Sequence, residues 1–273
     1  MRNLERSRDW DDFEFVPIDL ARGELFDLVA ECEVVFHLAA EPGVRQSWGT
    51  RFETYVRNNV LATQHVLEAA RRADLRRLVY ASSSSVYGQA ESLPTAEDAT
   101  PTPISPYGVT KLGSEHLVSM YARGYGLDAV SLRYFSVYGP RQRPDMAFSC
   151  FMRAVLDERP IELFGGQQTR DFTFVADIVR ATRAAADVAH PEQRLLNIGG
   201  GSRVSLNRCL EAIAELSGQE FDVLRVDDQR GDVRDTGADI SAARRSIGYE
   251  PLVSLDEGLH AQWEWTRADR DRT

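Results

Sequence analysis

The sequence has 273 residues, of which 43% are hydrophobic and 27% charged, as is typical of a globular protein with a large buried core. Its formal net charge of −10 excludes a broad basic surface for nucleic acid, so an anionic ligand would be bound by a few local arginines and backbone amides. Its scattered histidines and its three cysteines, Cys32, Cys150 and Cys209, fit neither a zinc site nor a disulfide framework. No apolar run reaches membrane-spanning length. We therefore expect a cytoplasmic protein without a metal.

Strand-like and helix-like segments alternate along the first half of the sequence. Apolar runs predict strands at residues 13–19, 33–40, 76–85 and 127–135, the second of them buried. Helices are predicted at residues 54–73 and 105–126, the second with a proline near its start and a glycine at its end. This alternation predicts a doubly wound, parallel α/β sheet whose ligands bind at the carboxyl ends of the strands. Asp19, Ala39, Ser83 and Ser136 would lie along that edge.

The second half of the sequence is less regular. Helices are predicted within residues 148–160 and at residues 205–217 and 255–267, and short extended pieces at residues 161–174 surround a Gly-Gly turn. Residues 195–201 are predicted to contain a strand that returns to the main sheet. We therefore expect a sheet domain at residues 1–138, completed by the returning strand near residues 194–199, and a smaller C-terminal lobe at residues 139–273.

Tyr107 and Lys111 are four residues apart in the predicted helix and so lie on one face of it. Tyrosine titrates near pH 10, but nearby positive charge stabilises the phenolate, and one pKa unit requires only about 1.4 kcal/mol. A lysine beside a cationic ligand ring would let the tyrosine act as a general base and then as an acid. The serines at residues 82–85, at the end of the preceding predicted strand, offer a hydroxyl for the reacting oxygen. The spacing alone is common in ordinary helices, so this interpretation depends on the neighbouring motifs.

Those motifs occur in an order that is typical of one protein family. They read VVFHLAAEPGVRQSW, NNVLATQHVLEAA, ASSSSVYG, SPYGVTK, LRYFSVYGPRQRPDM, TRDFTFVADIV, LNIGGG and GDVRDTGAD. Over nearly its whole length the sequence resembles the extended short-chain dehydrogenase/reductases, specifically the NAD-dependent nucleotide-sugar epimerases and dehydratases. The resemblance implies a Rossmann-like domain that binds NAD, a C-terminal lobe that mainly binds a UDP-sugar, and a homodimer formed through helices at residues 54–73 and 105–124.

The resemblance also implies roles for individual residues. Tyr107 would be the catalytic base, Lys111 would lower its pKa and hold the nicotinamide ribose, and Ser83 would be the hydroxyl partner. Further contacts to the cofactor would come from Asp19, Leu20, Ala39, Ala40, Asn59 and Phe135. Contacts to the sugar nucleotide would come from Ser83, Ser84, Ser136, Arg170, Arg230, Asp232 and Arg234. Arg45 and Arg141, in loops at the predicted strand edge, are additional candidates for ligand contact.

The residues after Ser83 narrow the reaction class within this family. The 4,6-dehydratases carry an Asp-Glu pair there and the decarboxylating members a glutamate, whereas this sequence has Ser84 and Ser85, which do not titrate. This favours epimerisation at C4 through a 4-keto sugar. The motifs are closest to UDP-glucuronate 4-epimerases, but Cys150 stands where that branch often has an arginine for the uronate carboxylate, so UDP-glucose stays open. A nucleotide-sugar reductase or dehydratase, or a non-catalytic protein that binds a dinucleotide or sugar nucleotide, is the alternative.

One family element is missing from the sequence. The opening strand and its glycine-rich turn, which hold the pyrophosphate of NAD at a helix N-terminus, have no counterpart here. The glycines at residues 199–201 lie late in the chain and are interpreted as a tight turn after a strand, and the family's Gly-Asp-Gly loop is shortened to Gly165-Gly166. We interpret the sequence as lacking the first β-α-β unit, with a start site further upstream as the favoured explanation, and expect an exposed strand edge.

Overall fold

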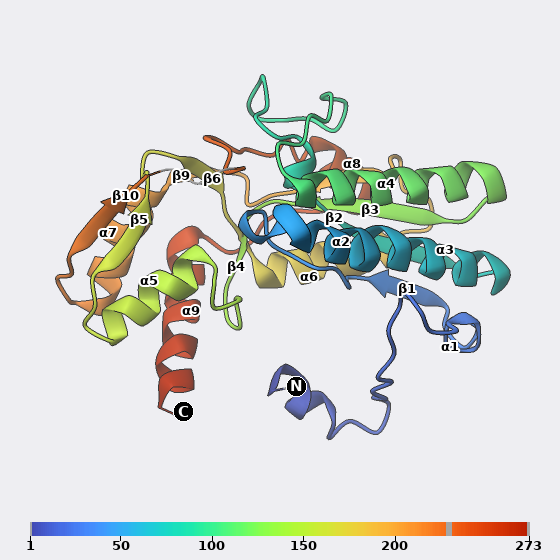
Figure 1. Ribbon diagram of the computed structural model, residues 1–273, viewed down its shortest axis with the longest axis horizontal. Helices are drawn as coiled ribbons and strands as arrows, with labels where there is room; N and C mark the ends of the chain where they lie inside the picture. The colour runs from blue at the N-terminus through green and yellow to red at the C-terminus, as the bar shows by residue number, and fades with distance from the viewer. Residues whose placement is uncertain (1, 228–230, 272–273) are drawn as a thin grey trace.

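A computed structural model describes residues 2–227 and 231–271 of the chain (Figure 1). Its centre is a four-stranded sheet in the order β1 (Val34–His37), β2 (Arg77–Ser83), β3 (Ala129–Tyr134) and β8 (Leu195–Ile198). All three neighbouring pairs are parallel, and β8 lies beside β3. The predicted parallel α/β sheet and its returning strand are therefore confirmed.

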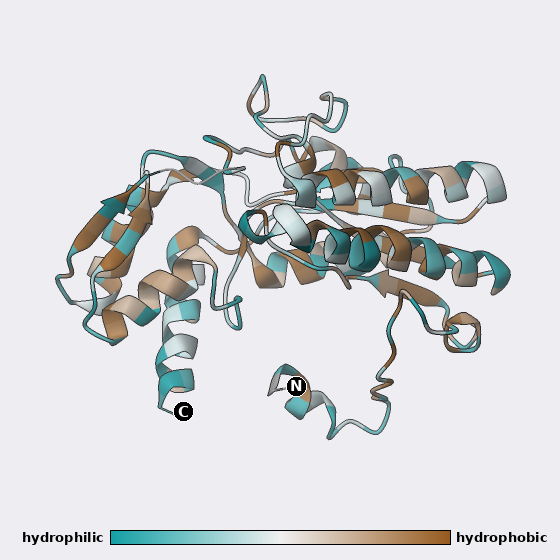
Figure 2. Ribbon diagram, in the orientation of Figure 1, coloured by the Kyte–Doolittle hydropathy of each residue, from teal (hydrophilic) through white to brown (hydrophobic). Residues whose placement is uncertain are grey.

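The first predicted strand is wrong. Residues 13–19 form no regular secondary structure, and most of them are exposed. Within the described ranges, β1 is an edge of the sheet and pairs only with β2, so residues 13–19 have no strand partner to satisfy their backbone. The strand predicted at residues 33–40 does form as β1, but it is not buried throughout, because 43% of Phe36 is exposed. Figure 2 shows β1 as a hydrophobic strand at the edge of the sheet.

Successive residues of β2 pack against helices on opposite faces of the sheet. Leu78 and Tyr80 belong to a core formed with α1 (Phe26–Ala30), α3 (Ala62–Arg72) and α4 (Pro106–Tyr125). Val79 belongs to a second core formed with α6 (Val175–Asp187) and α8 (Ser241–Ile247). The alternation follows from the two-residue period of a strand, and both faces of the sheet are covered, as parallel sheets require. No helix in the described part of the chain is long and apolar enough to cross a membrane.

Local sequence explains where the helix with the Tyr-Lys pair begins and ends. The side chain of Ser105 accepts a hydrogen bond from the backbone N–H of Gly108, Pro106 occupies the first turn, and Gly126 adopts a left-handed conformation with φ of 74° at the end of α4. The other predicted helix forms as α2 (Phe52–Tyr55), a π-helical turn η4 (Val56–Leu61) and α3, which follow one another without a break. Both helix predictions are confirmed.

The C-terminal half adds a separate hydrophobic core. It lies among α5 (Ala147–Leu156), α7 (Leu206–Ser217), α9 (Leu255–Arg270) and the parallel pair β5 (Ile161–Phe164) and β10 (Val223–Val226), which Figure 1 shows at the far end of the molecule from α3. Two further short pairs, β4 (Val137–Tyr138) with β7 (Thr173–Phe174) and β6 (Thr169–Asp171) with β9 (Arg203–Ser205), lie between this core and the main sheet. The division into domains at residue 138 stays a prediction.

A buried carboxylate fastens segments of the second half to one another. The side chain of Asp171, which is 1% exposed, accepts hydrogen bonds from the backbone N–H groups of Gly200 at 2.5 Å and Ala238 at 2.9 Å. Gly200 has no room for a side chain, since a Cβ there would lie 2.0 Å from the carbonyl oxygen of Phe172. The turn at residues 199–201 is therefore a structural turn, as predicted.

Replacing Asp171 with alanine will lower the free energy of unfolding by roughly 2–5 kcal/mol, because two buried N–H groups lose their acceptor. Urea denaturation measures this loss. The control is Asp239→Ala, which removes a more exposed carboxylate that accepts one bond from the backbone of Ser241 and should lower the stability by about 1 kcal/mol. Equal losses in the two variants would show that the buried contacts of Asp171 have no special weight.

Candidate active site

Tyr107 lies in the first turn of α4, where the helix faces the carboxyl end of β2. Its phenol interacts with the hydroxyl of Ser83, the last residue of β2, and its ring lies edge-on to Tyr55, with 6.3 Å between centroids. Burial raises the pKa of Tyr107, whereas the Ser83 hydrogen bond and the charge of Arg143 act in the opposite direction. Without a ligand, therefore, Tyr107 is a protonated phenol that further positive charge would convert into a base.

Lys111 lies one turn further along α4 and is 3% exposed. Its Nζ lies 4.6 Å from the centroid of the Tyr80 ring, on the neighbouring strand β2. Among the described residues, no hydrogen bond involves this ammonium group. Burial lowers the pKa of Lys111 to about 8, and the charge of Glu115 opposes that effect. The predicted pair is therefore brought together with Ser83, and Lys111 keeps its three donors for a ligand.

The residues predicted to contact the cofactor divide into two kinds. Asp19, Leu20, Ala39 and Ala40 lie at the surface beside the carboxyl end of β1, partly or fully exposed, and Asp19 is 3.6 Å from Arg57. Asn59, in contrast, is buried and its side chain bonds the backbone of Glu41 at 2.7 and 3.1 Å and Thr110 at 2.9 Å. Asn59 therefore ties the loop after β1 to α4.

Phe135 is also buried, at 1% exposure, and its ring lies 6.2 Å from that of Tyr87 within the core shared with α6. A contact between this residue and a cofactor would therefore have to come from its backbone. The late glycines do not replace the glycine-rich turn that the resemblance calls for, because Gly199 and Gly200 are packed against residues 171 and 172.

A cavity of about 480 Å³ lies between the end of β3 and the C-terminal core; Tyr107 is not in its wall, but Arg143, whose charge acts on Tyr107, is. The cavity is lined by three of the residues predicted to contact the sugar nucleotide, Ser136, Arg170 and Asp232. The guanidinium of Arg170 donates to the backbone carbonyls of Val233 and Arg234 at 2.6 and 2.9 Å and so holds that segment over the cavity. A cavity with arginines in its wall therefore lies near the predicted cluster at the sheet edge.

The other predicted contacts to the sugar nucleotide lie elsewhere. Arg234 projects outward with 80% of its side chain exposed, near Asp235 at 3.8 Å. Ser84 follows β2 in a short 3-10 turn, next to Ser83. Arg230 lies outside the described residues. Their roles stay predictions.

Two of the arginines in the cavity wall are held by carboxylates at its entrance. Arg45 forms an ion pair with Asp232 at 2.8 Å and stacks over the ring of Phe164 at 4.3 Å. Arg143 forms a bidentate pair with Asp145 at 3.0 and 2.9 Å through its Nε and Nη2. Arg141, in contrast, bonds the carbonyl of Asn3 at 3.4 Å and does not line this cavity.

Sequence reasoning missed Arg143. It lies in the motif GPRQRPDM, which was singled out, but the motif gives no reason to choose between its two arginines. The structure distinguishes the two arginines. Arg141 adopts a positive φ of 67° and turns away from the cavity, whereas the charge of Arg143 acts on Tyr107. Cys150 lines the same cavity, as expected for a residue near the substrate.

The chain is similar to known proteins along almost its whole length. The model of the NAD dependent epimerase/dehydratase family matches residues 2–199. A Bacillus subtilis protein described as an uncharacterized UDP-glucose epimerase, YtcB, is 40% identical over 95% of this chain and 82% of its own length. The UDP-glucuronate 4-epimerase of Thermodesulfobacterium geofontis is 38% identical over 97% of this chain and 82% of its own length.

Among solved structures, the UDP-glucuronic acid 4-epimerase of Bacillus cereus, crystallised with UDP-glucuronic acid and NAD, superimposes with a TM-score of 0.93 at 39% identity. The match covers 98% of this chain and 85% of that one. The family model, the relatives and the solved structure agree with the family that the order of motifs indicates. The chain therefore belongs to the NAD-dependent epimerase/dehydratase family.

Proposed function

We propose that the protein is an enzyme that epimerises a UDP-sugar at C4 with NAD as its cofactor. The observation that carries this proposal is the cluster of the buried Lys111 with the partly buried Tyr107 and Ser83, near an arginine-lined cavity. The relatives named for UDP-sugar 4-epimerases support it. So does the turn after Ser83, where Ser84 and Ser85 provide no acid or base for an elimination.

The residues present fit the nicotinamide-ribose end of NAD. The fit rests on the buried ammonium of Lys111, which has three donors, lies over the face of the Tyr80 ring and makes no hydrogen bond within the described residues. Lys111 would donate to the ribose hydroxyls, and the backbone at Ala39 and Ala40 would lie along the cofactor beyond the end of β1. The bound cofactor would supply an acceptor and donor of hydride and a positively charged ring.

The chain's own groups would move one proton and orient the sugar. Ser83 would hydrogen-bond the oxygen at C4, and Tyr107 would remove its proton and later return it. The raised pKa of Tyr107 means that its phenol holds its proton until a positive charge comes close, so base catalysis is linked to ligand binding. The cavity beside Ser136 has room for the sugar to turn over between the two hydride steps.

We propose UDP-glucuronate as the preferred substrate. Arg143 lines the cavity and its charge acts on Tyr107, which places a positive charge near the reacting end of the site. A guanidinium has five donors, and Asp145 engages only Nε and Nη2, so Nη1 stays available for a uronate carboxylate. Arg143 thus offers the charge that position 150, a cysteine in this chain, does not.

The test is turnover of UDP-glucuronate and, in parallel, of UDP-glucose by the whole chain with added NAD, followed by proton NMR of the sugar ring. The C4 epimer of either sugar supports the proposal, and faster conversion of UDP-glucuronate supports the preference. Calorimetric titration with NAD and with UDP is run on the same preparation. Binding of both ligands without any C4 epimer would overturn the proposed reaction, and a product lacking an oxygen would identify a dehydratase.

We further propose that two copies of the chain pair through the outer faces of η4, α3 and α4. Val56, Leu61, Val109 and Met120 leave apolar side chains exposed there, between 39% and 53%. Replacing Met120 with glutamate would place a charge in that face and should convert a dimer into a monomer in sedimentation velocity. The control is Leu252→Glu, at a 70% exposed leucine outside these helices. A monomeric wild-type protein would contradict the proposal.

We also propose that the protein works in the cytoplasm, because a reducing compartment suits its three free cysteines.

A further inference from the structure

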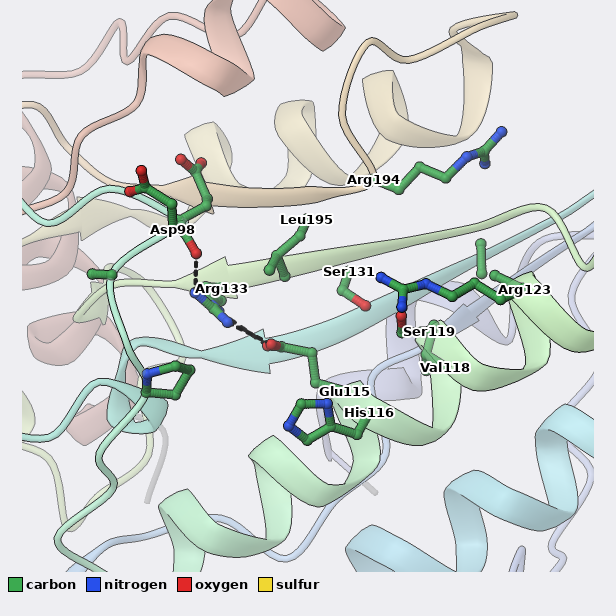
Figure 3. A pocket seen from close by; sticks show the side chains of 15 residues that line it. Asp98, Glu115, His116, Val118, Ser119, Arg123, Ser131, Arg133, Arg194 and Leu195 are labelled. Atoms are coloured by element: carbon green, nitrogen blue, oxygen red, sulfur yellow. Dashed lines mark hydrogen bonds and ion pairs between the residues drawn. The ribbon is translucent and has the colours of Figure 1, made fainter.

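A buried ion pair lies one helical turn beyond Lys111. Glu115, on the same face of α4, accepts hydrogen bonds from Arg133 of β3 at 2.5 Å to Oε1 and 3.0 Å to Oε2. The hydroxyl of Ser82, from β2, donates to Oε2 at 2.8 Å. The two charged side chains are only 2% and 8% exposed. Figure 3 shows the pair between α4 and the sheet, in the wall of a cavity of about 500 Å³.

Arg133 is itself held from the other side, so the carboxylate of Glu115 has a fixed place. Nη1 of Arg133 donates to the phenol oxygen of Tyr87 at 2.7 Å and to the carbonyl of Glu97 at 3.2 Å. The guanidinium of Arg133 also lies 4.6 Å from the centre of the Tyr87 ring. The hydroxyl of Tyr87 in turn donates to Asn197 on β8 at 2.7 Å. The network therefore spans α4 and three strands of the sheet, which makes it rigid.

Several elements place titratable or charged groups around this region. They are His37 on β1, Tyr80 on β2, Arg133 on β3, Tyr107 and Glu115 on α4, and, beyond Tyr107, Tyr55 of α2 and Arg143. Burial and the charge of Lys111 lower the pKa of His37 to about 4, so His37 is neutral at physiological pH. Burial raises the pKa of Tyr80 far above its usual range, so Tyr80 is neutral as well. Glu115 is thus the negative charge that acts on Lys111.

We propose that Glu115, fixed by Arg133 and Ser82, is a positioning residue that keeps the buried ammonium of Lys111 charged beneath Tyr107. A buried ammonium that makes no hydrogen bond within the described chain would otherwise favour its neutral form. Residues four apart on a helix lie about 5–6 Å from each other, close enough for the carboxylate to oppose this. Arg133 needs Glu115 as its own counter-ion, so one acid stabilises two buried cations.

The consequence for catalysis rests on the proposed function. Only a charged Lys111 can stabilise the phenolate of Tyr107, and only the ammonium form has three donors for ribose hydroxyls. Since burial brings the pKa of Lys111 down to about 8 even with Glu115 present, loss of the carboxylate would bring deprotonation into the physiological range. Glu115 would thereby set the upper pH limit of activity without touching the substrate.

The sequence makes this inference directly measurable. Of the 32 lysine and arginine residues in the chain, Lys111 is the only lysine. Protein expressed with lysine labelled by ¹³C at the ε carbon will therefore give one side-chain signal, and its chemical shift reports the protonation of Lys111. The titration uses the whole chain without substrate, so its result does not depend on whether the protein epimerises any UDP-sugar.

In the wild-type protein we expect a titration midpoint near the pKa of about 8. Replacing Glu115 with glutamine removes the carboxylate and leaves Arg133 as an unpaired positive charge, and both changes favour the neutral lysine. The midpoint should fall by about one to two pH units, and Glu115→Asp, which keeps the charge, should stay much closer to wild type. In turnover assays the loss of activity at high pH should move downward by a similar amount.

The matched control is Asp128→Asn. It also removes the carboxylate partner of a buried arginine, Arg77 at 2.7 Å, but at the opposite ends of β2 and β3, so the lysine midpoint should not change. If Glu115→Gln does not fold, the double variant Glu115→Gln/Arg133→Met removes both buried charges and should still lower the midpoint. An unchanged or higher midpoint in a folded Glu115 variant that lacks the carboxylate would overturn the inference.

Discussion

Replacing Tyr107 with phenylalanine will reduce epimerisation by roughly 10²–10⁴-fold, the range in which a positioned acid–base group contributes to a rate. The substitution removes one oxygen from a partly buried ring that stays in contact with Tyr55, so the packing of α4 should be retained. Calorimetric affinities for UDP and NAD should remain within a few-fold of wild type. The rate is followed as formation of the C4 epimer by NMR.

The control for this variant is Tyr134→Phe. It removes a phenol oxygen that shares a hydrogen bond of 2.7 Å with Thr182 of α6, on the other face of the sheet from α4. Turnover in this control should stay within about twofold of wild type, since no reacting atom lies on that face. A Tyr107→Phe protein that still turned over at the wild-type rate would assign the base to another group, and a non-catalytic sugar-nucleotide sensor would show no turnover in any variant.

Replacing Arg143 with leucine will lower kcat/KM for UDP-glucuronate by about 10²-fold and leave that for UDP-glucose within several-fold. The reason is that a charged hydrogen bond to the carboxylate, of about 1.5–3 kcal/mol, is lost only with the uronate. The comparison of the two sugars is the measurement that matters, because a general disturbance of the cavity would affect both.

Arg141→Leu is the matched control, two residues earlier in the same loop. Its guanidinium bonds the carbonyl of Asn3 and does not line the cavity, so both sugars should be converted as by the wild type. If Arg143→Leu slowed both sugars equally, the arginine would act on the diphosphate or on Tyr107 instead of on the uronate carboxylate. That outcome would remove the main structural support for UDP-glucuronate as the preferred substrate.

The parts of the fold that local sequence determines were predictable. The helix with Tyr107 and Lys111 has its cap at Ser105, its proline in the first turn and its glycine at residue 126, and all of these signals lie within a single segment. The four-residue spacing then brings the pair onto one face, and the strand before it delivers Ser83. These features required no knowledge of tertiary contacts.

What could not be predicted depends on neighbours far away in the sequence. Residues 13–19 have the composition of a strand, but a strand forms only where another strand satisfies its backbone, and β1 does not pair with them. The direction of Arg143 relative to Arg141 depends on a backbone turn and on Asp145. Phe135 follows β3, and its side chain packs into the core beside Tyr87, a placement that the alternation along the strand does not predict; its contact with a cofactor stays a prediction.

The identity of the basic residues has a further consequence for how the protein can be handled. Apart from Lys111, every cationic side chain except histidine is a guanidinium, which stays charged at any pH used in the laboratory. Lys111 is 3% exposed, so amine-directed dyes, biotin esters and sensor-chip chemistry have no readily accessible lysine side chain to react with. Reaction of such a reagent at Lys111 will therefore report that α4 has opened.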